Sequence, residues 1–429
     1  MNDATSTATR STARPDLGAG RSWRRVLVYG FGLSGRAAAA LLLGRGAAVL
    51  AVDGRRREAL DLEGLPSGSL ETWEESSHAA RAGELPADVE AVVLSPGVPP
   101  DRPLLAAARR RGLPVISELE LAFPLVDGPV VAITGSNGKS TTTALAGAMI
   151  AAGGRPVEVC GNIGTPLSAV VGAGAGERVF VVEVSSFQLE AVETFRPRAG
   201  ALLNLSPDHL DRYDSFDAYV AAKERLFERQ QADDVAVLNA DDPRAAAAPT
   251  RARRRLFSRR GAVADGCWLA GDAVVETGPG GEATLFARAE LPLAGAHNLE
   301  NAMAAALLAR AVGTPVEAVR RSLVGFQGLP HRMQRVAESG GVTWYDDSKA
   351  TNVAATAKSL ADLPDGTVHL ILGGKAKGDD PAELRELVRA KAKRVYLVGA
   401  AAELFARGLA GAAPQERADT IERAVGGGG

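Results

Sequence analysis

A short loop between an apolar strand and a helix constrains this chain more than any other feature. Val130–Ile133 predicts a buried strand, and the alanine-rich run from Thr141 to Ala152 predicts a helix. The loop between them reads Thr134-Gly135-Ser136-Asn137-Gly138-Lys139-Ser140-Thr141. In this context backbone N–H groups and a lysine hold phosphates, and a serine hydroxyl reaches Mg²⁺. The loop therefore predicts an ATP site, unless it is a chance turn that contains a lysine.

The loop is a shortened variant of the standard phosphate loop. The standard spacing requires a glycine five residues before Gly138, but Ile133 occupies that position and the nearer Gly135 takes its place. This spacing separates the chain from the common ATPases.

Length and the order of predicted elements indicate three domains. Domains usually contain about 100 to 200 residues, and the chain has 429. Apolar runs that alternate with helical segments predict an α/β fold in which each domain has a mainly parallel sheet. We expect a Rossmann-like N-terminal domain, a central domain of the P-loop ATPase type and a Rossmann-like C-terminal domain. The expected boundaries are a disordered tail at residues 1–24 and domains at 25–125, 126–327 and 328–429.

Composition excludes several classes of protein. Apolar residues make up 46% and charged residues 23% of the chain, as in ordinary globular proteins. The net charge of -2 gives no basic footprint for nucleic acid, and no apolar stretch approaches the ~20 residues of a membrane span. Two cysteines are too few for a disulfide scaffold, and the N-terminal residues lack the apolar core of a secretory signal. We therefore expect a cytoplasmic protein.

A second glycine-rich turn lies near the N-terminus. Gly30, Gly32 and Gly35 follow the apolar strand Val26–Tyr29 and precede a helix, and Asp53 ends the next strand. This arrangement is typical of nucleotide-binding α/β domains, in which the turn approaches a diphosphate and the carboxylate approaches a ribose. The pattern does not require NAD, because any nucleoside diphosphate suits it, and a tight structural turn is the alternative.

Three residues of the predicted central domain are candidates for a metal site. Glu183 ends the apolar strand Val179–Val184, where it can hold Mg²⁺ directly or through water or be an ordinary edge carboxylate. His209 lies between two carboxylates and is a candidate metal ligand or base, or a capping histidine of a loop. Lys223 is either buried, and then paired or chemically altered, or it extends its amine to solvent. Its predicted helix face is apolar and carries Phe216, Tyr219, Val220, Leu226 and Phe227.

Polar loops in the C-terminal third carry further cations. Asp347-Ser348-Lys349 follows the predicted strand Val342–Tyr345, and Lys375 and Lys377 follow the strand Val368–Leu372 in a glycine-rich loop. Two cationic loops at neighbouring strand ends predict an anion held between domains, with a solvated basic edge as the alternative.

Taken together, these motifs resemble the Mur ligases, the ATP-dependent amide-forming enzymes of bacterial peptidoglycan synthesis. The resemblance covers nearly the whole chain after the tail, and it is strongest to the members that add D-glutamate. It rests on the phosphate loop and on Asp208-His209-Leu210-Asp211-Arg212-Tyr213, Gly328-Leu329-Pro330-His331-Arg332 and Asp347-Ser348-Lys349-Ala350-Thr351-Asn352. The last of these motifs separates the D-glutamate-adding members from their relatives.

The resemblance implies a reaction and a role for each matching residue. ATP phosphorylates the alanine carboxylate of UDP-N-acetylmuramoyl-L-alanine, and the amine of D-glutamate then attacks the acyl phosphate. This reaction belongs to the synthesis of the cell wall, which sets cell shape and allows cell division. The protein is expected to act as a monomer. The implied catalytic residues are Lys139, Glu183, His209, Lys223, Lys349 and Lys377. The implied ATP contacts are Gly135 to Thr141, Asn301, Arg332 and Asp347, and the implied substrate contacts are Leu33, Ser34, Asp53, Arg55, Asn162, Ser185 and Lys349. Two Mg²⁺ sites are implied, one at Ser140 and Glu183 and one at His209 and Lys223, with the lysine as its carbamate.

One departure from the family pattern concerns the C-terminus. Members of this family continue with a last strand and a loop that helps to seat D-glutamate, whereas here four glycines follow Val425. The C-terminal domain is therefore expected to be incomplete. Two alternatives follow, namely a non-catalytic nucleotide-binding homologue and another amide ligase of the folate polyglutamylating type.

Overall fold

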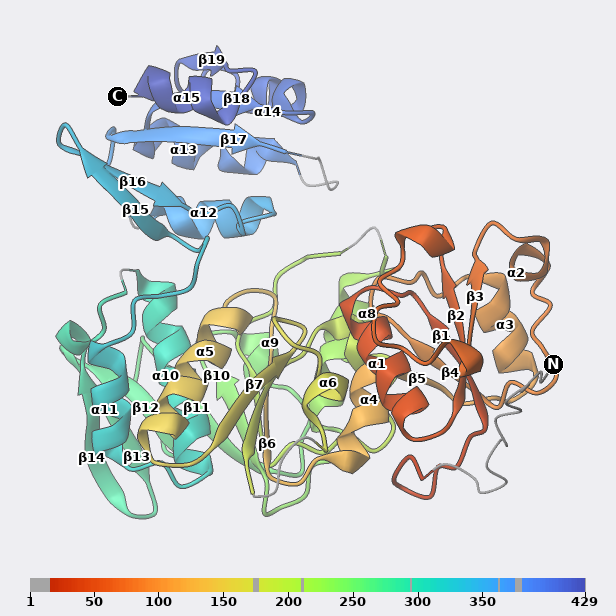
Figure 1. The fold of residues 1–429 in the computed structure, drawn as a ribbon. Coiled ribbons are helices and arrows are strands. Elements are labelled where there is room, and N and C mark those ends of the chain that lie inside the picture. Colours follow the sequence, from red (N-terminus) through yellow and green to blue (C-terminus); the bar gives the residue numbers. More distant parts are fainter. Residues whose placement is uncertain are drawn as a thin grey trace, which may run out of the picture. The chain divides into compact units, whose positions relative to one another are not determined.

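The computed structural model describes residues 16–172, 177–209, 212–293, 295–361, 363–374 and 380–428. These residues form two compact units, of which the first contains residues up to Phe286 together with Met303–Ser322. The second unit contains Ala287–Ala302 and the chain from Leu323 onward. The fold is α/β with mainly parallel sheets, as the sequence predicts (Figure 1). The predicted domain boundaries remain predictions.

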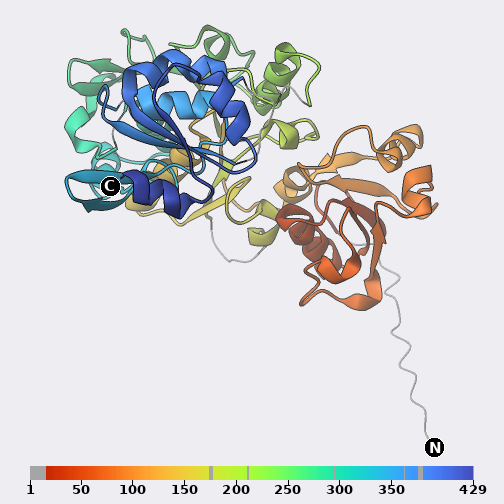
Figure 2. The same ribbon diagram turned by 90° about the horizontal axis from the view of Figure 1, so that it is seen from above.

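The first sheet of unit one is parallel throughout and has the strand order β3-β2-β1-β4-β5. Its strands are β1 (Arg25–Tyr29), β2 (Ala48–Asp53), β3 (Leu70–Glu74), β4 (Ala91–Leu94) and β5 (Val115–Ser117). Its helices are α1 (Leu33–Gly44), α2 (His78–Ala82), α3 (Pro103–Arg110) and α4 (Glu118–Ala122). Helix α1 packs on one face of the sheet and α3 on the other, each over its own apolar cluster (Figure 2). The strand order reverses between β1 and β4, where sheets of this kind bind ligands.

The second sheet of unit one has nine strands in the order β14-β13-β12-β11-β10-β9-β6-β8-β7. The strands that flank the phosphate loop are β6 (Val130–Thr134), β8 (Val179–Glu183) and β9 (Ala199–Leu202). The others are β7 (Val157–Gly161), β10 (Val235–Asn239), β11 (Arg253–Ser258), β12 (Gly266–Ala270), β13 (Ala273–Gly278) and β14 (Gly281–Ala287). The helices are α5 (Lys139–Ala152), α6 (Leu167–Val170), α7 (Ser186–Leu189), α8 (Phe216–Glu224), α9 (Pro243–Ala246), α10 (Ala296–Ala311) and α11 (Val316–Val324). The sheet becomes antiparallel where β12 pairs with β13.

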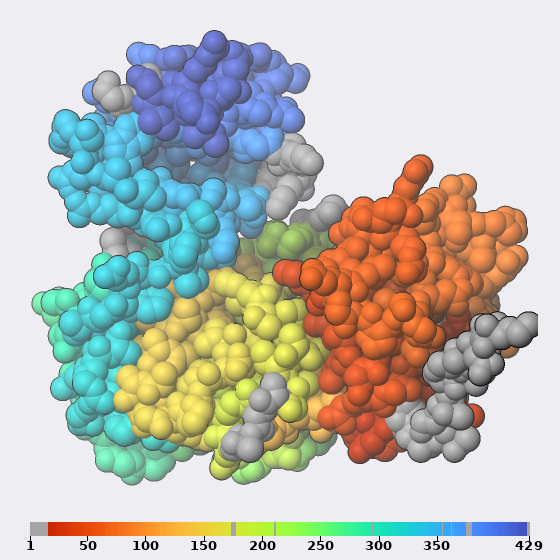
Figure 3. All heavy atoms as spheres, in the orientation of Figure 1, coloured from red at the N-terminus to blue at the C-terminus, as the bar shows by residue number. Residues whose placement is uncertain are grey.

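Hydrogen bonds and an ion pair join the two sheets of the first unit. Ser117 N donates to Ala191 O at 2.8 Å, and Glu120 on α4 accepts from the backbone of residues 193–195. Arg21 also contributes to this junction, because it forms an ion pair with Glu120. The space-filling view shows the red and orange residues of the first sheet against the yellow residues that follow them (Figure 3).

The described part of the predicted disordered tail belongs to the fold. Leu17 is fully buried in the core of the first sheet, and Trp23 packs against the same cluster. The prediction of disorder is therefore wrong for residues 16–24, because polar and alanine-rich composition did not reveal these two apolar anchors. Residues 1–15 lie outside the described part of the chain.

The second unit contains a parallel sheet and a separate hairpin. The sheet has the order β17-β18-β19, and the antiparallel hairpin pairs β15 with β16. Its strands are β15 (Gln334–Ser339), β16 (Val342–Asp346), β17 (Val368–Gly373), β18 (Ala392–Val398) and β19 (Gln415–Arg417). Its helices are α12 (Val353–Ala361), α13 (Arg385–Lys391), α14 (Ala402–Gly408) and α15 (Ile421–Gly428). In the described part of the chain, no helix combines the length and apolar character that a membrane crossing needs.

Candidate active site

The phosphate loop joins β6 to α5 and is hydrogen-bonded to the segment that follows β9. Asn137 N donates to Asn204 Oδ1 at 2.9 Å, Asn204 Nδ2 donates to Asn137 O at 3.0 Å, and Ser136 N donates to Asn204 O at 2.9 Å. Gly138 has φ 85°, a left-handed conformation that glycine adopts without strain. No side chain caps the N-terminus of α5, which spans 14 residues. The N–H groups of its first turn therefore face the loop, as an anion site requires.

Strand β9 ends at Leu202. Beyond that point Asn204 and Ser206 turn to the phosphate loop instead of continuing the ladder. Ser206 N donates to Ser136 Oγ at 3.0 Å, and Ser136 Oγ lies 3.1 Å from the hydroxyl of Tyr219. The loop is thus fixed by side chains more than 60 positions away in the sequence.

Two lysines meet at one carbonyl of this loop. Lys139 Nζ donates to Gly135 O at 2.9 Å and to Ser136 O at 3.0 Å, and Lys223 Nζ donates to Gly135 O at 2.9 Å. Lys223 is 1% exposed, so its helix face is buried as one reading of the sequence predicted, and the solvent-exposed alternative is wrong. Its Nζ also lies 4.6 Å from the ring centroid of Tyr219. Burial, and after it the charge of Lys139, lowers the pKa of Lys223 well below its ordinary value.

Glu183 ends β8 beside the strand that leads into the phosphate loop, and its side chain is almost fully buried. Oε1 accepts from Asn162 Nδ2 at 2.9 Å, and Asn162 N donates to Glu183 O at 2.8 Å. Oε2 is buried without a hydrogen-bond partner among the described residues. A buried carboxylate oxygen with no donor is costly unless it meets a cation or a ligand group.

His209 is half-exposed and lies near the aromatic rings of Phe187 and Tyr219. Its backbone has φ 56°, and its ring lies 4.9 Å from the ring of Phe187 and 6.4 Å from that of Tyr219. Its Nε2 is 3.7 Å from Asp208 Oδ2. Lys223 and His209 therefore both lie near the ring of Tyr219. Asp211, the second carboxylate of the motif, lies outside the described residues.

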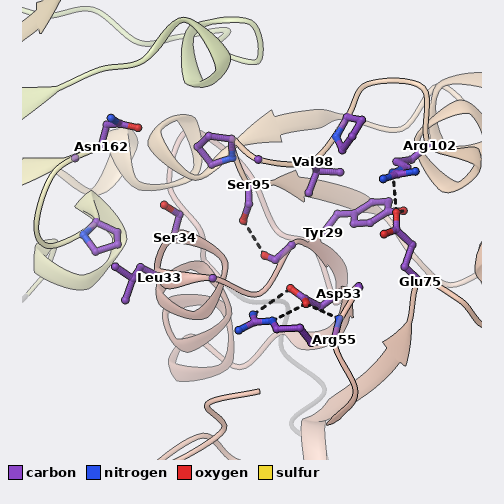
Figure 4. A pocket seen from close by; sticks show the side chains of 18 of the residues that line it. Tyr29, Leu33, Ser34, Asp53, Arg55, Glu75, Ser95, Val98, Arg102 and Asn162 are labelled. Carbon is purple, nitrogen blue, oxygen red and sulfur yellow. Dashed lines mark hydrogen bonds and ion pairs between the residues drawn. The ribbon is translucent and has the colours of Figure 1, made fainter. Parts of the chain in front are cut away.

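A cavity of about 510 Å³ opens at the carboxyl edge of the first sheet (Figure 4). It gathers five residues predicted to contact the nucleotide substrate, namely Leu33, Ser34, Asp53, Arg55 and Asn162. Glycine is required at position 35, because a Cβ there would lie 1.8 Å from Gly30 O. Asp53 accepts from Phe31 N at 2.6 Å and forms an ion pair with Arg55 at 2.8 Å. These hydrogen bonds outweigh burial and lower the pKa of Asp53.

Ser185 follows β8 but has a local structural role. Its hydroxyl accepts from Gln188 N, and the Gln188 side chain accepts from Ser185 N, which together form a capping box on α7. Contact with substrate at Ser185 remains a prediction.

The remaining predicted residues lie in the second unit. Asp347 Oδ2 accepts from Ser359 Oγ at 2.6 Å and Oδ1 accepts from Met333 N at 3.0 Å, whereas the Lys349 side chain is exposed. Arg332 lies in the turn before β15, and Asn301 is buried in the part of α10 that belongs to the second unit. Lys375 and Lys377 lie outside the described residues, so their predicted roles stay predictions.

Several residues of the site were not found from the sequence. Arg212 donates to Pro96 O and Val98 O at 3.0 and 3.1 Å and lies 4.1 Å from the ring of Phe187, so it ties the loop after His209 to the rim of the cavity. Glu75 and Arg102 line the cavity with Tyr29. Arg212 belongs to a motif quoted above, at residues 208–213, but no role was predicted for it. Glu75 and Arg102 belong to no motif that a single sequence reveals.

Models of three protein domains match consecutive parts of the chain. They are the Mur ligase MurD-like N-terminal domain at residues 24–117, the Mur ligase middle domain at 133–309 and the Mur ligase glutamate ligase domain at 331–426. The chain belongs to the Mur ligase family. Curated Mur ligases of Anaeromyxobacter dehalogenans and Myxococcus xanthus are 46% and 45% identical to it over 94% of this chain and 88% and 90% of their own lengths. A third, from Acidobacterium capsulatum, is 44% identical over 94% of this chain and 87% of its length.

Each of these three relatives is named UDP-N-acetylmuramoylalanine--D-glutamate ligase. Solved structures of more distant Mur ligases share the fold. The UDP-N-acetylmuramate-alanine ligase of Thermotoga maritima has a TM-score of 0.58 at 18% identity and covers 92% of this chain and 90% of its own. A pseudomurein peptide ligase of Methanothermus fervidus also has a TM-score of 0.58 at 18% identity, with 93% and 89% covered. The three-domain architecture predicted from the sequence is that of the family.

Proposed function

We propose that this Mur ligase uses ATP to join D-glutamate to UDP-N-acetylmuramoyl-L-alanine through an acyl phosphate. The observation that carries the proposal is the match to D-glutamate ligases at 44 to 46% identity over 94% of the chain. The site geometry supports it, because one unit holds both a phosphate loop and a cavity suited to a nucleoside diphosphate.

The chain's own residues explain how the carboxylate is activated. The N–H groups in the first turn of α5 and the ammonium of Lys139 hold the terminal phosphates of ATP and neutralise the oxygens of the transferring group. Asn162 lines the cavity and also binds Glu183, so it joins the nucleotide cavity to the phosphoryl site. We assign Lys349 and Lys377 to the reacting carboxylates, and Asn301, Arg332 and Asp347 to the nucleoside and phosphates of ATP.

The residues present fit a magnesium site beside the phosphate loop. Glu183 offers a buried oxygen without a hydrogen-bond partner among the described residues, and Ser140 lies in the first turn of α5, which follows the neighbouring strand β6. Mg²⁺ prefers such oxygen ligands and usually completes its shell with phosphates and water. No group of three or more His, Cys, Asp and Glu side chains within the described ranges is arranged to hold a metal by itself. When bound, the ion supplies charge neutralisation on the phosphates.

A second magnesium site at His209 and Lys223 needs a change in the lysine. Its lowered pKa favours the neutral amine, whose lone pair can add to CO2 with loss of a proton. The product is a carbamate whose two oxygens share one negative charge, and a hard cation binds such oxygens but cannot bind an ammonium. We assign the reaction to the cytoplasm and to a monomer; both cysteines are free and buried, as suits a reducing compartment.

The function is tested by phosphate release in the presence of Mg²⁺ and UDP-N-acetylmuramoyl-L-alanine, with and without D-glutamate. We expect release that depends on both substrates and stops in Lys139→Ala. ATP binding without release under any substrate combination would support the non-catalytic homologue instead. Release with a folate and glutamate, but not with the nucleotide substrate, would assign another amide ligase activity.

A further inference from the structure

The loop between β7 and α6 holds the carboxylate of the phosphoryl site. Asn162 of this loop donates its backbone N–H to Glu183 O at 2.8 Å and its side-chain amide to Glu183 Oε1 at 2.9 Å. The second bond sets the rotation of the carboxylate, and with it the direction of Oε2, which has no hydrogen-bond partner among the described residues. A shift of this loop would therefore turn the carboxylate of Glu183.

The same loop is short and leads directly into α6. Gly161 N donates to Thr165 O at 2.9 Å, which closes a turn around Asn162. Helix α6 begins directly after Pro166, whose side chain carries no acceptor and does not cap the helix. The first-turn N–H groups of a helix need acceptors, and a buried helix start without them is costly. The cap of α6 must therefore come from another element.

A buried acid on α4 supplies this cap. Glu118, the first residue of α4, accepts from Ser168 N at 2.5 Å through Oε1. Helix α6 packs against α4 and α1, and Leu119 of α4 lies in the same apolar cluster as Leu167 of α6 (Figure 1). The end of the loop is thus fixed by a side chain that lies 50 positions earlier in the sequence.

The surroundings of Glu118 suit an uncharged acid. Its Oε2 is buried and has no hydrogen-bond partner in the described part of the chain. Glu120 on the same helix differs, because it pairs with Arg21 and accepts from three backbone N–H groups. Burial raises the pKa of Glu118, and the hydrogen bonds with Ser168 offset only part of that rise. One acceptor is enough to cap α6, whereas an anion would leave a charged oxygen without a donor.

We propose that Glu118 is a positioning residue for phosphoryl transfer, which as an uncharged acid caps α6 and thereby holds Asn162 against Glu183. This inference rests on the proposed function, which supplies the reaction that the loop serves. Glu118 does not line the cavity, so its effect reaches the reacting groups through Asn162. A displacement of about 1 Å at a reacting group can cost about a hundredfold in rate. Loss of the cap should therefore lower kcat and leave the KM for ATP unchanged, because Asn204 holds the phosphate loop separately.

The kinetic test compares two substitutions of Glu118. Glu118→Leu removes the acceptor, so kcat should fall about tenfold at an unchanged KM for ATP. Glu118→Gln keeps an acceptor without a charge, so its kcat should equal that of the wild type. Ser117→Ala is the matched control, because it removes the side-chain cap of α4 and leaves the cap of α6 in place, and its kcat should also be unchanged. A wild-type kcat in Glu118→Leu, or an equal loss in Glu118→Gln, would overturn the proposal.

A double-mutant cycle separates positioning from a general loss of stability. In Asn162→Ala the side-chain bond to Glu183 is already lost, so adding Glu118→Leu should lower kcat by less than about twofold further. Two effects on kcat that multiply in full would mean that Glu118 does not act through Asn162, and the proposal would fail.

Hydrogen–deuterium exchange provides a second measurement that needs no substrate. The amide N–H groups of Gly161 and Asn162 are hydrogen-bonded, and peptides that contain them should exchange about tenfold faster in Glu118→Leu but not in Ser117→Ala. Unchanged exchange in Glu118→Leu would overturn the capping role whether or not the protein is an active ligase. Faster exchange in this variant, together with a wild type that shows no ligase turnover, would support the capping role and count against the proposed function.

Discussion

Glu120 provides the sharpest test of how the two sheets of the first unit are held together. Its carboxylate is fully buried and accepts from Glu193 N, Thr194 N and Phe195 N at 3.0 to 3.1 Å. Thr194 Oγ1 donates at 2.6 Å, and Arg21 forms an ion pair at 2.5 Å. One side chain of α4 thus satisfies three backbone N–H groups, one hydroxyl and one buried cation.

The Glu120→Ala variant should lose about 4 to 6 kcal/mol of unfolding free energy. Removal of one partner of a buried ion pair costs about 3 to 5 kcal/mol, and we add about 1 kcal/mol for one buried donor left unpaired, with water reaching the other donors. Because 1 kcal/mol shifts Tm by about 2 to 4 °C in domains of ~150 to 250 residues, Tm should fall by about 10 °C or more in differential scanning calorimetry.

The control is Glu193→Ala, which removes a half-exposed carboxylate 3.8 Å from the same arginine. An exposed pair contributes about 0 to 1 kcal/mol, so this variant should melt within about 2 °C of the wild type. If Glu120→Ala also melted within 2 °C of the wild type, the junction would not depend on this carboxylate, and the reasoning would be wrong.

Three further substitutions test the site and the second unit. Lys223→Met should abolish ligase turnover without lowering Tm. It replaces a buried amine that has one carbonyl partner with an apolar side chain of similar length. A large loss of Tm would mean that the ammonium is well paired. Glu183→Gln keeps the oxygen that binds Asn162 but removes the negative charge. Phosphate release should therefore fall about a hundredfold and should need a higher Mg²⁺ concentration in a titration. An unchanged Mg²⁺ dependence would count against a metal ligand at this position. A hydrogen bond from His331 lowers the pKa of Asp346 to about 2, so its stabilising effect is present above the ordinary carboxyl pKa of 3.8 and is lost as the pH falls toward 2. Melting curves of Asp346→Asn and the wild type should therefore differ at pH 6 and converge near pH 2, and a constant difference would contradict this assignment.

Local features of the site could be predicted from the sequence because they depend on neighbouring residues. The phosphate loop follows from a strand, two glycines and a helix within about 20 positions, and the burial of Lys223 follows from apolar residues at helical spacing. The α/β class follows in the same way from the alternation of strands and helices.

Contacts between distant segments could not be predicted in this way. Asn204 meets the phosphate loop across 67 positions, and Arg212 meets the rim of the cavity across 116. Polar composition also concealed the role of Arg21, whose partner Glu120 lies 99 positions away. A single sequence contains no signal for such pairs, because neither periodicity nor turn chemistry relates residues that only the tertiary fold brings together.

The central claim, that ATP activates a carboxylate for amide formation, is tested most directly by isotope transfer. UDP-N-acetylmuramoyl-L-alanine labelled with ¹⁸O in its alanine carboxylate is incubated with ATP, Mg²⁺ and D-glutamate, and the released phosphate is analysed by mass spectrometry. The carboxylate oxygen that attacks the terminal phosphorus should leave with the phosphate when the amine displaces it. We predict one ¹⁸O atom in each phosphate released. Phosphate that carries no label while amide product accumulates would contradict the acyl phosphate and, with it, the role assigned to the phosphate loop.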